Sequence, residues 1–193
     1  SFYDGRVKMG NRTHLNRIEM SSPFNKEVIF FDTSNSKNPF EQNDGFSAKN
    51  NTESETISEI ILPKLFENEA QPSSIAIIAP YKSQVANIKN YINKSDSCKF
   101  KNIDVSTLDS FQGKEYDIII FSFTRSSDHN NAPFENGKRK FAKVGFLDDA
   151  RRLNVAFSRA KKKLILIGNS KTLVDSRSHF DRIFNYTELF KTL

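Results

Sequence analysis

The chain has little cysteine and no long apolar segment. Its single cysteine, Cys98, excludes an internal disulfide framework and favours a reducing compartment. No apolar run is long enough to cross a bilayer, and the first residues do not form a signal peptide. The three histidines, His14, His129 and His179, are isolated, so no metal site is expected. These absences together predict an intracellular protein with no membrane partner.

What the chain does have is positive charge. Lysine and arginine number 29 against 23 acidic residues, giving a net charge of +6 and an isoelectric point near 9.3. Such a balance permits an anionic partner, of which nucleic acid is the obvious one. The 193 residues suffice for one domain with a real core, and we expect residues 1–193 to form a single domain.

Short apolar runs alternate with helical patterns along most of the chain. Runs that lack in–out alternation are typical of strands buried on both faces, as in parallel sheets. We therefore predict a doubly wound α/β domain with helices on both faces of a mainly parallel sheet. The strands are expected at residues 28–31, 75–79, 103–106, 117–123 and 164–167. The helices are expected from Glu53, with a kink or split at Pro63, at 81–92, from Asp148 and at 178–193.

Three stretches lack this periodicity. Residues 1–25 are predicted to be a loop-rich leading segment, and residues 34–49, with Pro39 and Gly45, a polar loop. Residues 128–143 are rich in polar residues, proline and glycine, and are predicted to be a surface loop insertion. Its cluster Lys138-Arg139-Lys140 is either an extra nucleic-acid contact or, more simply, a solvated loop.

The helix that starts at Asp148 carries two arginines on one flank. Arg152 and Arg159 are two turns apart beside the apolar stripe, and Lys161 to Lys163 are expected to offset the helix dipole at its end. A guanidinium presents a fixed fork of donors that suits phosphate oxygens. The arginines therefore either reach a ligand in a cleft or pair with acids on a neighbouring element.

The run from Ser106 to Glu115 connects two predicted strands at the carboxyl end of the first. Open α/β sheets place ligand sites at this end. Thr107 can cap a short helical turn, and Gly113 can end it with a positive φ. Hydrogen-bonding side chains crowd the run, at Asp109, Gln112 and Glu115. It is either a ligand loop or a well-capped connection.

A third candidate stretch, residues 77–84, passes from a strand through Pro80-Tyr81 into a helix. The amino terminus of that helix offers backbone donors to an anion or a nucleic-acid phosphate. Taken alone the signal is weak, because every α/β fold contains such helix ends.

The wording and order of these stretches resemble superfamily 1 helicases. Motif IV is matched by Ala-Pro-Tyr-Lys-Ser-Gln at 79–84, motif V by Asp-Ser-Phe-Gln-Gly-Lys-Glu at 109–115, and motif VI by Arg-Arg-Leu-Asn-Val-Ala-Phe-Ser-Arg-Ala-Lys at 151–161. The match is to the branch of the nonsense-mediated-decay RNA helicase and its DNA and RNA relatives. It is strong over residues 75–173. An Asn-x-x-Glu element at 50–53 resembles the family more loosely.

The resemblance implies the second RecA-like domain of a two-domain motor, with ATP and Mg²⁺ held between it and an upstream domain of the same chain. Arg159 matches the arginine finger that offsets charge on the transferring phosphoryl group. Arg152 would support the same cleft or couple it to nucleic acid. The loop that meets the nucleotide corresponds to Gln112, Gly113 and Glu115, with Glu115 a candidate for the ribose. Asn51 stands where some relatives carry a second arginine facing the nucleotide, which puts that contact in doubt.

The same resemblance implies a track for single-stranded DNA or RNA. Backbone contacts of this kind carry little sequence information. The positions that match it are Pro80, Tyr81, Lys82, Gln84, Ser106, Thr107 and Arg125.

No Gly-x-x-x-x-Gly-Lys-Ser/Thr phosphate loop and no Asp-Glu pair at a strand end occur in the sequence. The chain alone is therefore not expected to hydrolyse ATP. The leading hypothesis is the C-terminal motor domain of an ATP-dependent, 5′–3′ helicase. The alternatives are a nucleic-acid-binding module that has lost ATP coupling and a plain doubly wound domain with another ligand. The sequence does not distinguish DNA from RNA.

Overall fold

The fold is described from a computed structural model, for residues 24–67, 74–95, 100, 103–111, 113–127, 134–135, 138–139 and 150–175. Gln112, Asp148, the expected helix at 178–193 and nearly all of the leading segment lie outside the described residues, as does most of the 128–143 insertion. In the ranges described, no helix has both the length and the apolar character needed to span a membrane.

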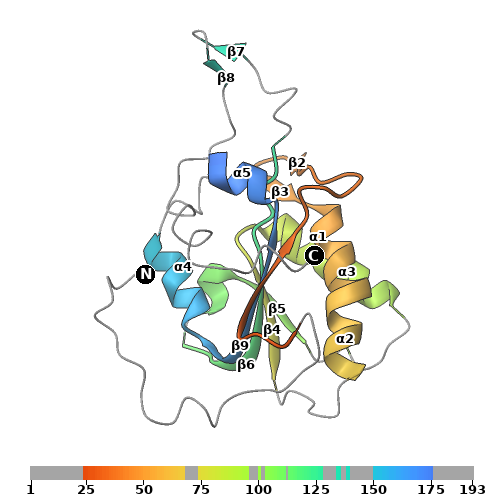
Figure 1. Cartoon of the computed structure of the whole chain (residues 1–193), viewed down its shortest axis with the longest axis vertical. Helices are drawn as coiled ribbons and strands as arrows, with labels where there is room; N and C mark the ends of the chain where they lie inside the picture. Colours follow the sequence, from red (N-terminus) through yellow and green to blue (C-terminus); the bar gives the residue numbers. More distant parts are fainter. Residues whose placement is uncertain are drawn as a thin grey trace.

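Five parallel strands form the central sheet (Figure 1), in the order β1-β9-β6-β4-β5. All five predicted strands are confirmed, and β9 begins four residues earlier than expected. Their bounds are β1 Val28–Asp32, β4 Ile75–Ala79, β5 Asp104–Thr107, β6 Tyr116–Ser122 and β9 Ala160–Gly168.

Helices cover both faces of the sheet (Figure 1), which confirms the doubly wound α/β class. One face is covered by a long helical run and by α3 Lys82–Lys94. The run consists of α1 Asn51–Thr56, η2 Ile57–Ile61 and α2 Leu62–Glu67. The opposite face carries the 3-10 turn η4 Leu108–Phe111, α4 Ala150–Phe157 and α5 Ser170–Asp175.

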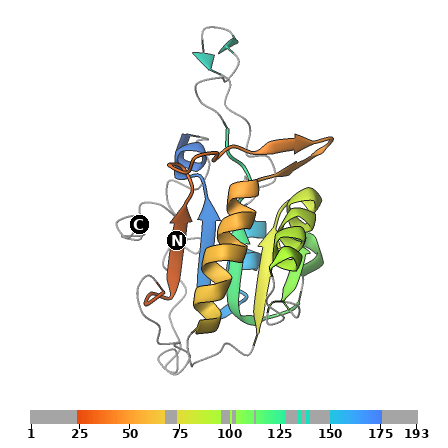
Figure 2. The same cartoon turned by 90° about the vertical axis from the view of Figure 1, so that its right-hand side faces the viewer.

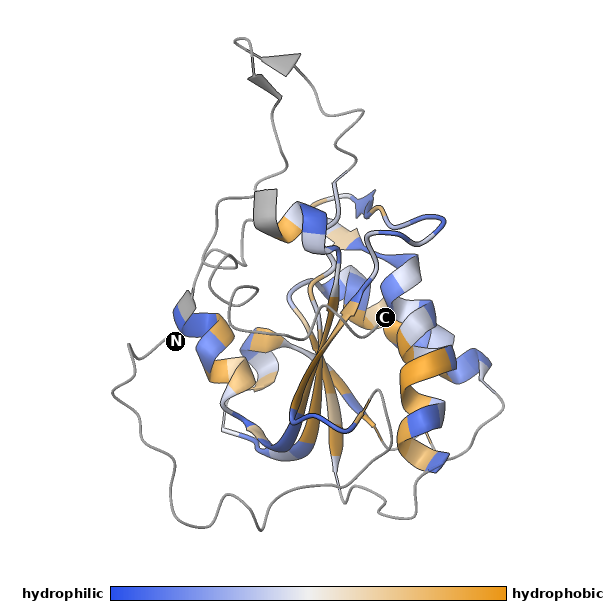
Figure 3. Ribbon diagram, viewed as in Figure 1, coloured by the Kyte–Doolittle hydropathy of each residue, from blue (hydrophilic) through white to orange (hydrophobic). Residues whose placement is uncertain are grey.

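Alternate residues of each strand point to opposite faces of the sheet and so pack into two different core clusters. Ile77 and Ile120 join the core cluster beneath the long helical run and α3, whereas Ile78 and Phe121 join the cluster beneath α4 and η4. Both faces are thus apolar, and Figure 3 shows the strands as a hydrophobic layer between helices whose outer faces are hydrophilic. The ends of the neighbouring strands β6 and β9 approach closely at Gly168, where an added Cβ would lie 2.9 Å from Cβ of Phe123.

The helix that was expected to kink or split at Pro63 is not split, and its winding changes locally just before the proline. Residues 57–61 form a π-helical segment in which the Leu62 N–H donates to the Ile57 carbonyl, five residues earlier. Proline has no N–H to donate, so the regular hydrogen-bond ladder cannot continue through it. The wider turn directly before Pro63 absorbs this defect without ending the helix.

The prediction of a polar loop at residues 34–49 was wrong in part, because this stretch contains a β-hairpin. Strands β2 Gln42–Asp44 and β3 Ser47–Lys49 pair antiparallel around Gly45, which has φ of +61°. The Asn-Asp-Gly sequence at 43–45 is the turn signal that would have revealed it. Likewise, the insertion contains a short antiparallel pair, β7 Phe134–Glu135 and β8 Lys138–Arg139.

The end of α4 also differs from the sequence prediction. The helix stops at Phe157, so Arg159 lies in the following turn, and Lys161 to Lys163 belong to β9 and do not offset a helix dipole. Lys163 is buried, which lowers the pKa of its ammonium group. Its Nζ donates to the backbone carbonyl of Phe24, at 2.7 Å, and to that of Lys26.

Candidate functional site

The candidate residues fall into two groups at opposite ends of the parallel sheet. At the beginning of β6, the Tyr116 N–H donates to the Arg159 carbonyl at 3.1 Å. At the other end of β6, Ser122 contacts Glu53 of α1. Because all the strands run the same way, Figure 2 shows one edge of the sheet where they begin and another where they end. We call these the amino edge and the carboxyl edge.

The carboxyl edge holds the strand–turn–helix stretch that begins at Pro80. Pro80 and Tyr81 are half-buried between β4 and α3, and Lys82 is exposed in the first turn of the helix. That turn contains no acidic residue. A lysine at a helix amino terminus adds to the positive end of the dipole, an arrangement that an anion would stabilise.

Arg125 fixes Tyr81 at this edge and does not extend into solvent. Its guanidinium pairs with Glu41 at 3.0 Å and lies 5.8 Å from the Tyr81 ring centroid. The side chain of Arg125 is only 17% exposed. We therefore interpret Arg125 as a positioning residue for the Tyr81 turn.

Gln84, expected to contact nucleic acid, is completely buried, so this prediction was wrong. Its Oε1 accepts from the Asn50 N–H at 2.7 Å, and its Nε2 donates to the Ser122 hydroxyl at 2.9 Å. Asn50 caps α1, because its side chain accepts from the Glu53 N–H. Gln84 thus joins the start of α3, the start of α1 and the end of β6, and Asn-x-x-Glu is part of this junction.

Glu53 is the acidic member of this buried network, and sequence reasoning missed its role. Its Oε2 accepts from the Ser122 hydroxyl at 2.5 Å and from the Thr124 N–H at 2.9 Å. Among the described residues, Oε1 has no hydrogen-bond partner. Complete burial raises the pKa of Glu53 to about 8, and the two hydrogen bonds only partly oppose this. The carboxyl is therefore largely neutral at pH 7.

Asn51 belongs to the carboxyl edge and lies apart from Arg159. Its Oδ1 accepts from Nδ2 of Asn87 on α3 at 3.0 Å. Glu53, in the same helix, meets the end of β6, whereas Arg159 meets its beginning. The structure therefore does not bring Asn51 into one cleft with Arg159.

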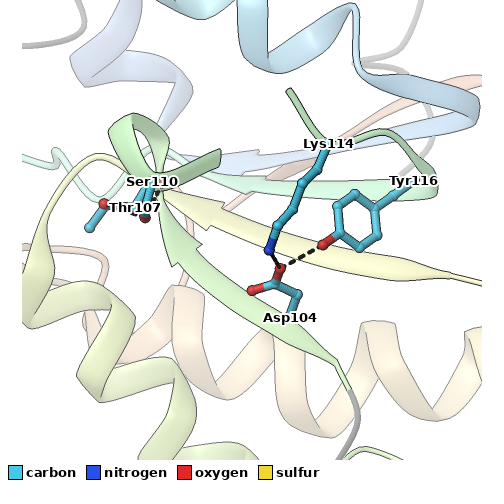
Figure 4. A network of polar contacts seen from close by, with 5 residues as sticks. All are labelled: Asp104, Thr107, Ser110, Lys114 and Tyr116. Atoms are coloured by element: carbon cyan, nitrogen blue, oxygen red, sulfur yellow. Dashed lines mark hydrogen bonds and ion pairs between the residues drawn. The ribbon is translucent and has the colours of Figure 1, made fainter. Parts of the chain in front are cut away.

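The turn after β5 also ends at the carboxyl edge. The hydroxyls of Thr107 and Ser110 lie 2.8 Å apart, and Ser110 donates to the Thr107 carbonyl at 2.9 Å (Figure 4). Ser106 is half-buried, and its hydroxyl has no partner within the described chain. The predicted positive φ of Gly113 is confirmed at +89°. The loop therefore turns as expected between β5 and β6.

The chain then returns to the amino edge, where a polar clamp holds it. Figure 4 shows Lys114 and Tyr116 converging on Asp104 at the start of β5, at 3.0 Å and 2.5 Å. Burial raises the pKa of Asp104, but the hydrogen bonds from Tyr116 and Lys114 outweigh it and hold that pKa below its ordinary value. The clamp fixes the backbone on both sides of Glu115.

Arg159 faces Glu115 at this edge through a long contact. Its Nη1 lies 3.9 Å from Oε1 of Glu115, and Lys161 lies 3.5 Å from Oε2. Both distances exceed a normal hydrogen bond. Among the described residues, Nε of Arg159 has no hydrogen-bond partner. The Arg159 side chain is a third exposed, on a backbone fixed by the Tyr116 bond.

Arg152 lies on α4 and faces the 3-10 turn. Its Nη2 is 3.9 Å from Oδ1 of Asp109, and both side chains are well exposed. Both arginines thus have an acidic neighbour on the connection between β5 and β6, as one sequence-based interpretation proposed. Exposed pairs at such distances contribute about 0–1 kcal/mol. A contact of this kind leaves the Arg159 guanidinium able to exchange partners.

Comparison with known proteins shows the family to which this fold belongs. The family model described as AAA domain matches residues 1–171. The chain belongs to this family, in the nonsense-mediated-decay branch of superfamily 1 helicases. Its sheet and helices are those of a RecA-like domain.

Several curated relatives share this domain. Regulator of nonsense transcripts 1 of Caenorhabditis elegans is 34% identical over 179 residues, covering 89% of this chain and 15% of the relative. ATP-dependent helicase upf1 of Schizosaccharomyces pombe is 38% identical over 67% of this chain and 13% of its own length. DNA polymerase alpha-associated DNA helicase A of Saccharomyces cerevisiae is 43% identical over 52% of this chain and 13% of its own length. The chain thus spans well under a fifth of each of these relatives.

Proposed function

We propose that this chain is the C-terminal motor domain of an ATP-dependent nucleic-acid helicase that moves 5′ to 3′. An upstream RecA-like domain of the same protein would supply the phosphate loop and hold Mg²⁺. Relatives named ATP-dependent helicase and DNA helicase support the activity, although they extend far beyond this chain. On its own, the chain would be inactive towards ATP.

The observation that carries the proposal is the state of Arg159. Its backbone is fixed by a hydrogen bond to β6, while among the described residues its guanidinium has only a long contact, to Glu115. A group held in this way can turn to a phosphate without breaking a strong interaction. Offsetting charge on a transferring phosphoryl group is worth on the order of 10³-fold or more in rate. Glu115, held by the neighbouring clamp, would accept from the ribose hydroxyls.

The carboxyl edge would carry the single-stranded nucleic acid. Lys82, exposed at the start of α3, suits a phosphate. The Thr107 turn ends at the same edge and would contact the strand as well. Nucleotide and nucleic acid would thus occupy opposite ends of the sheet, linked by the length of β6.

The test is an Arg159→Ala substitution in the full-length protein. Nucleic-acid-stimulated ATPase should fall by on the order of 10³-fold, while affinity for single-stranded DNA or RNA stays the same. Lys161→Ala, which removes the other cation beside Glu115, is the matched control and should keep most of the activity. Undiminished ATPase in Arg159→Ala would rule out the arginine-finger assignment.

The position of Asn51 gives no support to the alternative, a nucleic-acid-binding module without ATP coupling. Asn51 lies with Asn87 at the carboxyl edge, so its amide does not weaken a phosphate contact beside Arg159. If wild-type full-length protein bound nucleic acid but showed no ATPase, the alternative would replace the motor proposal.

A further inference from the structure

We propose that Phe46, at the tip of the β2–β3 hairpin, stacks on a base of the single-stranded nucleic acid held at the carboxyl edge. The inference rests on the proposed function, since it takes nucleic acid as the partner of that edge. It adds a base contact to a surface whose other candidate contacts are to the backbone.

The aromatic ring of Phe46 is not needed to pack or to turn the hairpin. Phe46 has a relative exposure of 113%, against 42% for Phe40 and 44% for Ile60. The turn is made by Gly45, and the residue that the hairpin buries is Ala48, at 2%. A ring this exposed, which packs on none of the residues that the structure describes, is available to a partner.

The hairpin that carries this ring is firmly mounted. At its base, the Glu41 N–H donates to the Ser126 carbonyl at 3.0 Å, and the Ser126 N–H donates to the Glu41 carboxylate at 2.7 Å. Glu41 also pairs with Arg125. Near its tip, the hydroxyl of Ser47 accepts from the Ser83 N–H at 3.2 Å. Because the hairpin backbone is held in this way, only the side-chain torsions of Phe46 remain to be ordered when the ring binds.

The position of the hairpin selects nucleic acid as the partner. Figure 2 shows it standing beyond the ends of the strands, at the carboxyl edge. Ser47, next to Phe46, contacts the first turn of α3, where Lys82 is exposed. A strand whose phosphate lies at that turn would have its bases beside the hairpin tip. Stacking on an aromatic ring tolerates any base, because every base has a π-face.

The experiment compares Phe46→Ala with wild type in the full-length protein. Affinity is measured by fluorescence anisotropy for labelled oligothymidylate, for oligouridylate and for an abasic oligonucleotide of equal length. Phe46→Ala should bind the two base-bearing oligonucleotides about tenfold more weakly. It should bind the abasic one as tightly as wild type does, with an unchanged salt dependence. Phe46→Trp should retain the affinity.

Two further variants act as controls. Ile60→Ala removes an exposed apolar side chain from the helical run and should leave all affinities unchanged. Lys82→Ala should weaken binding to all three oligonucleotides, because it removes a contact to phosphate and leaves any base contact intact. The thermal midpoint of Phe46→Ala should equal that of wild type, because the ring is fully exposed.

Equal affinities of wild type and Phe46→Ala for the base-bearing strands would overturn the inference. An equal loss on base-bearing and abasic strands would also overturn it, because the ring would then not act on bases. Unchanged affinities with a reduced ATPase would assign Phe46 to a contact with another domain. Failure of the wild-type protein to bind any of the oligonucleotides would instead refute the proposed function.

Discussion

The two edges of the sheet are built in contrasting ways. At the carboxyl edge, Asn50, Glu53, Gln84 and Ser122 are completely buried and joined by hydrogen bonds of 2.5–3.3 Å. At the amino edge, Arg159 faces Glu115 across 3.9 Å in partial contact with solvent. Apart from Oε1 of Glu53, which has no hydrogen-bond partner among the described residues, the groups of the first arrangement bond to one another within the domain. The second can be exchanged for a ligand at little cost, as expected of one half of a shared site.

Breaking the carboxyl-edge network should have the largest effect on stability. Gln84→Leu keeps a side chain of similar size but leaves the Asn50 N–H and the Ser122 hydroxyl without their Gln84 partner. Buried groups left without partners cost about 1–3 kcal/mol each, so we expect a loss of about 3 kcal/mol in unfolding free energy. Urea unfolding measures it. Gln42→Leu, at an exposed position on β2, should change little.

Glu53 makes the carboxyl edge sensitive to pH. The unfolded chain releases this proton near pH 4.5, whereas the folded chain keeps it to about pH 8. The protonated Glu53 carboxyl therefore contributes fully to the free energy of unfolding below pH 4.5. This contribution is lost as the pH rises towards 8, and the free energy of unfolding falls by on the order of 1.4 kcal/mol per pH unit in that window.

Glu53→Gln removes the titrating proton and should flatten this fall. Thermal unfolding of wild type and variant between pH 5 and pH 8 measures the difference in slope. Glu55→Gln, an exposed position in the same helix, should keep the wild-type slope. Parallel curves for wild type and Glu53→Gln would contradict a neutral buried carboxyl.

The amino edge should show the smallest effect on stability. Arg159→Ala removes only a long, partly exposed contact to Glu115, so the unfolding free energy should change by less than about 1 kcal/mol. The same variant is expected to abolish most of the ATPase activity in the full-length protein. A large stability loss on urea unfolding would mean that Arg159 is structural.

The sheet could be predicted from the sequence because its signal is local. Unbroken apolar runs such as 75–79 and 117–123 need both faces covered, and this requirement alone indicates a parallel sheet. The Asn-Asp-Gly turn was local as well, and the hairpin was missed because its strands are only three residues long and β2 is exposed.

The site could be predicted only in part, because much of it depends on distant residues. The end of α4 has no glycine or proline, so nothing in the sequence placed Arg159 outside the helix. From its sequence neighbours, Lys163 would be taken for a surface lysine. It is buried because the fold places the carbonyls of Phe24 and Lys26, distant in sequence, beside its ammonium group. Gln84 is a polar residue in a helical first turn, and its burial depends on Asn50 and Ser122, from two other elements.

The position of β9 between β1 and β6 has a consequence for the order of folding. β1 pairs with β9, near the end of the described chain, and Lys163 reaches back 137 residues to the Lys26 carbonyl. During synthesis, β4, β5 and β6 can associate as they emerge, whereas β1 must wait for β9 to arrive. The last-made strand therefore closes the sheet, and it brings with it Arg159, the residue directly before it.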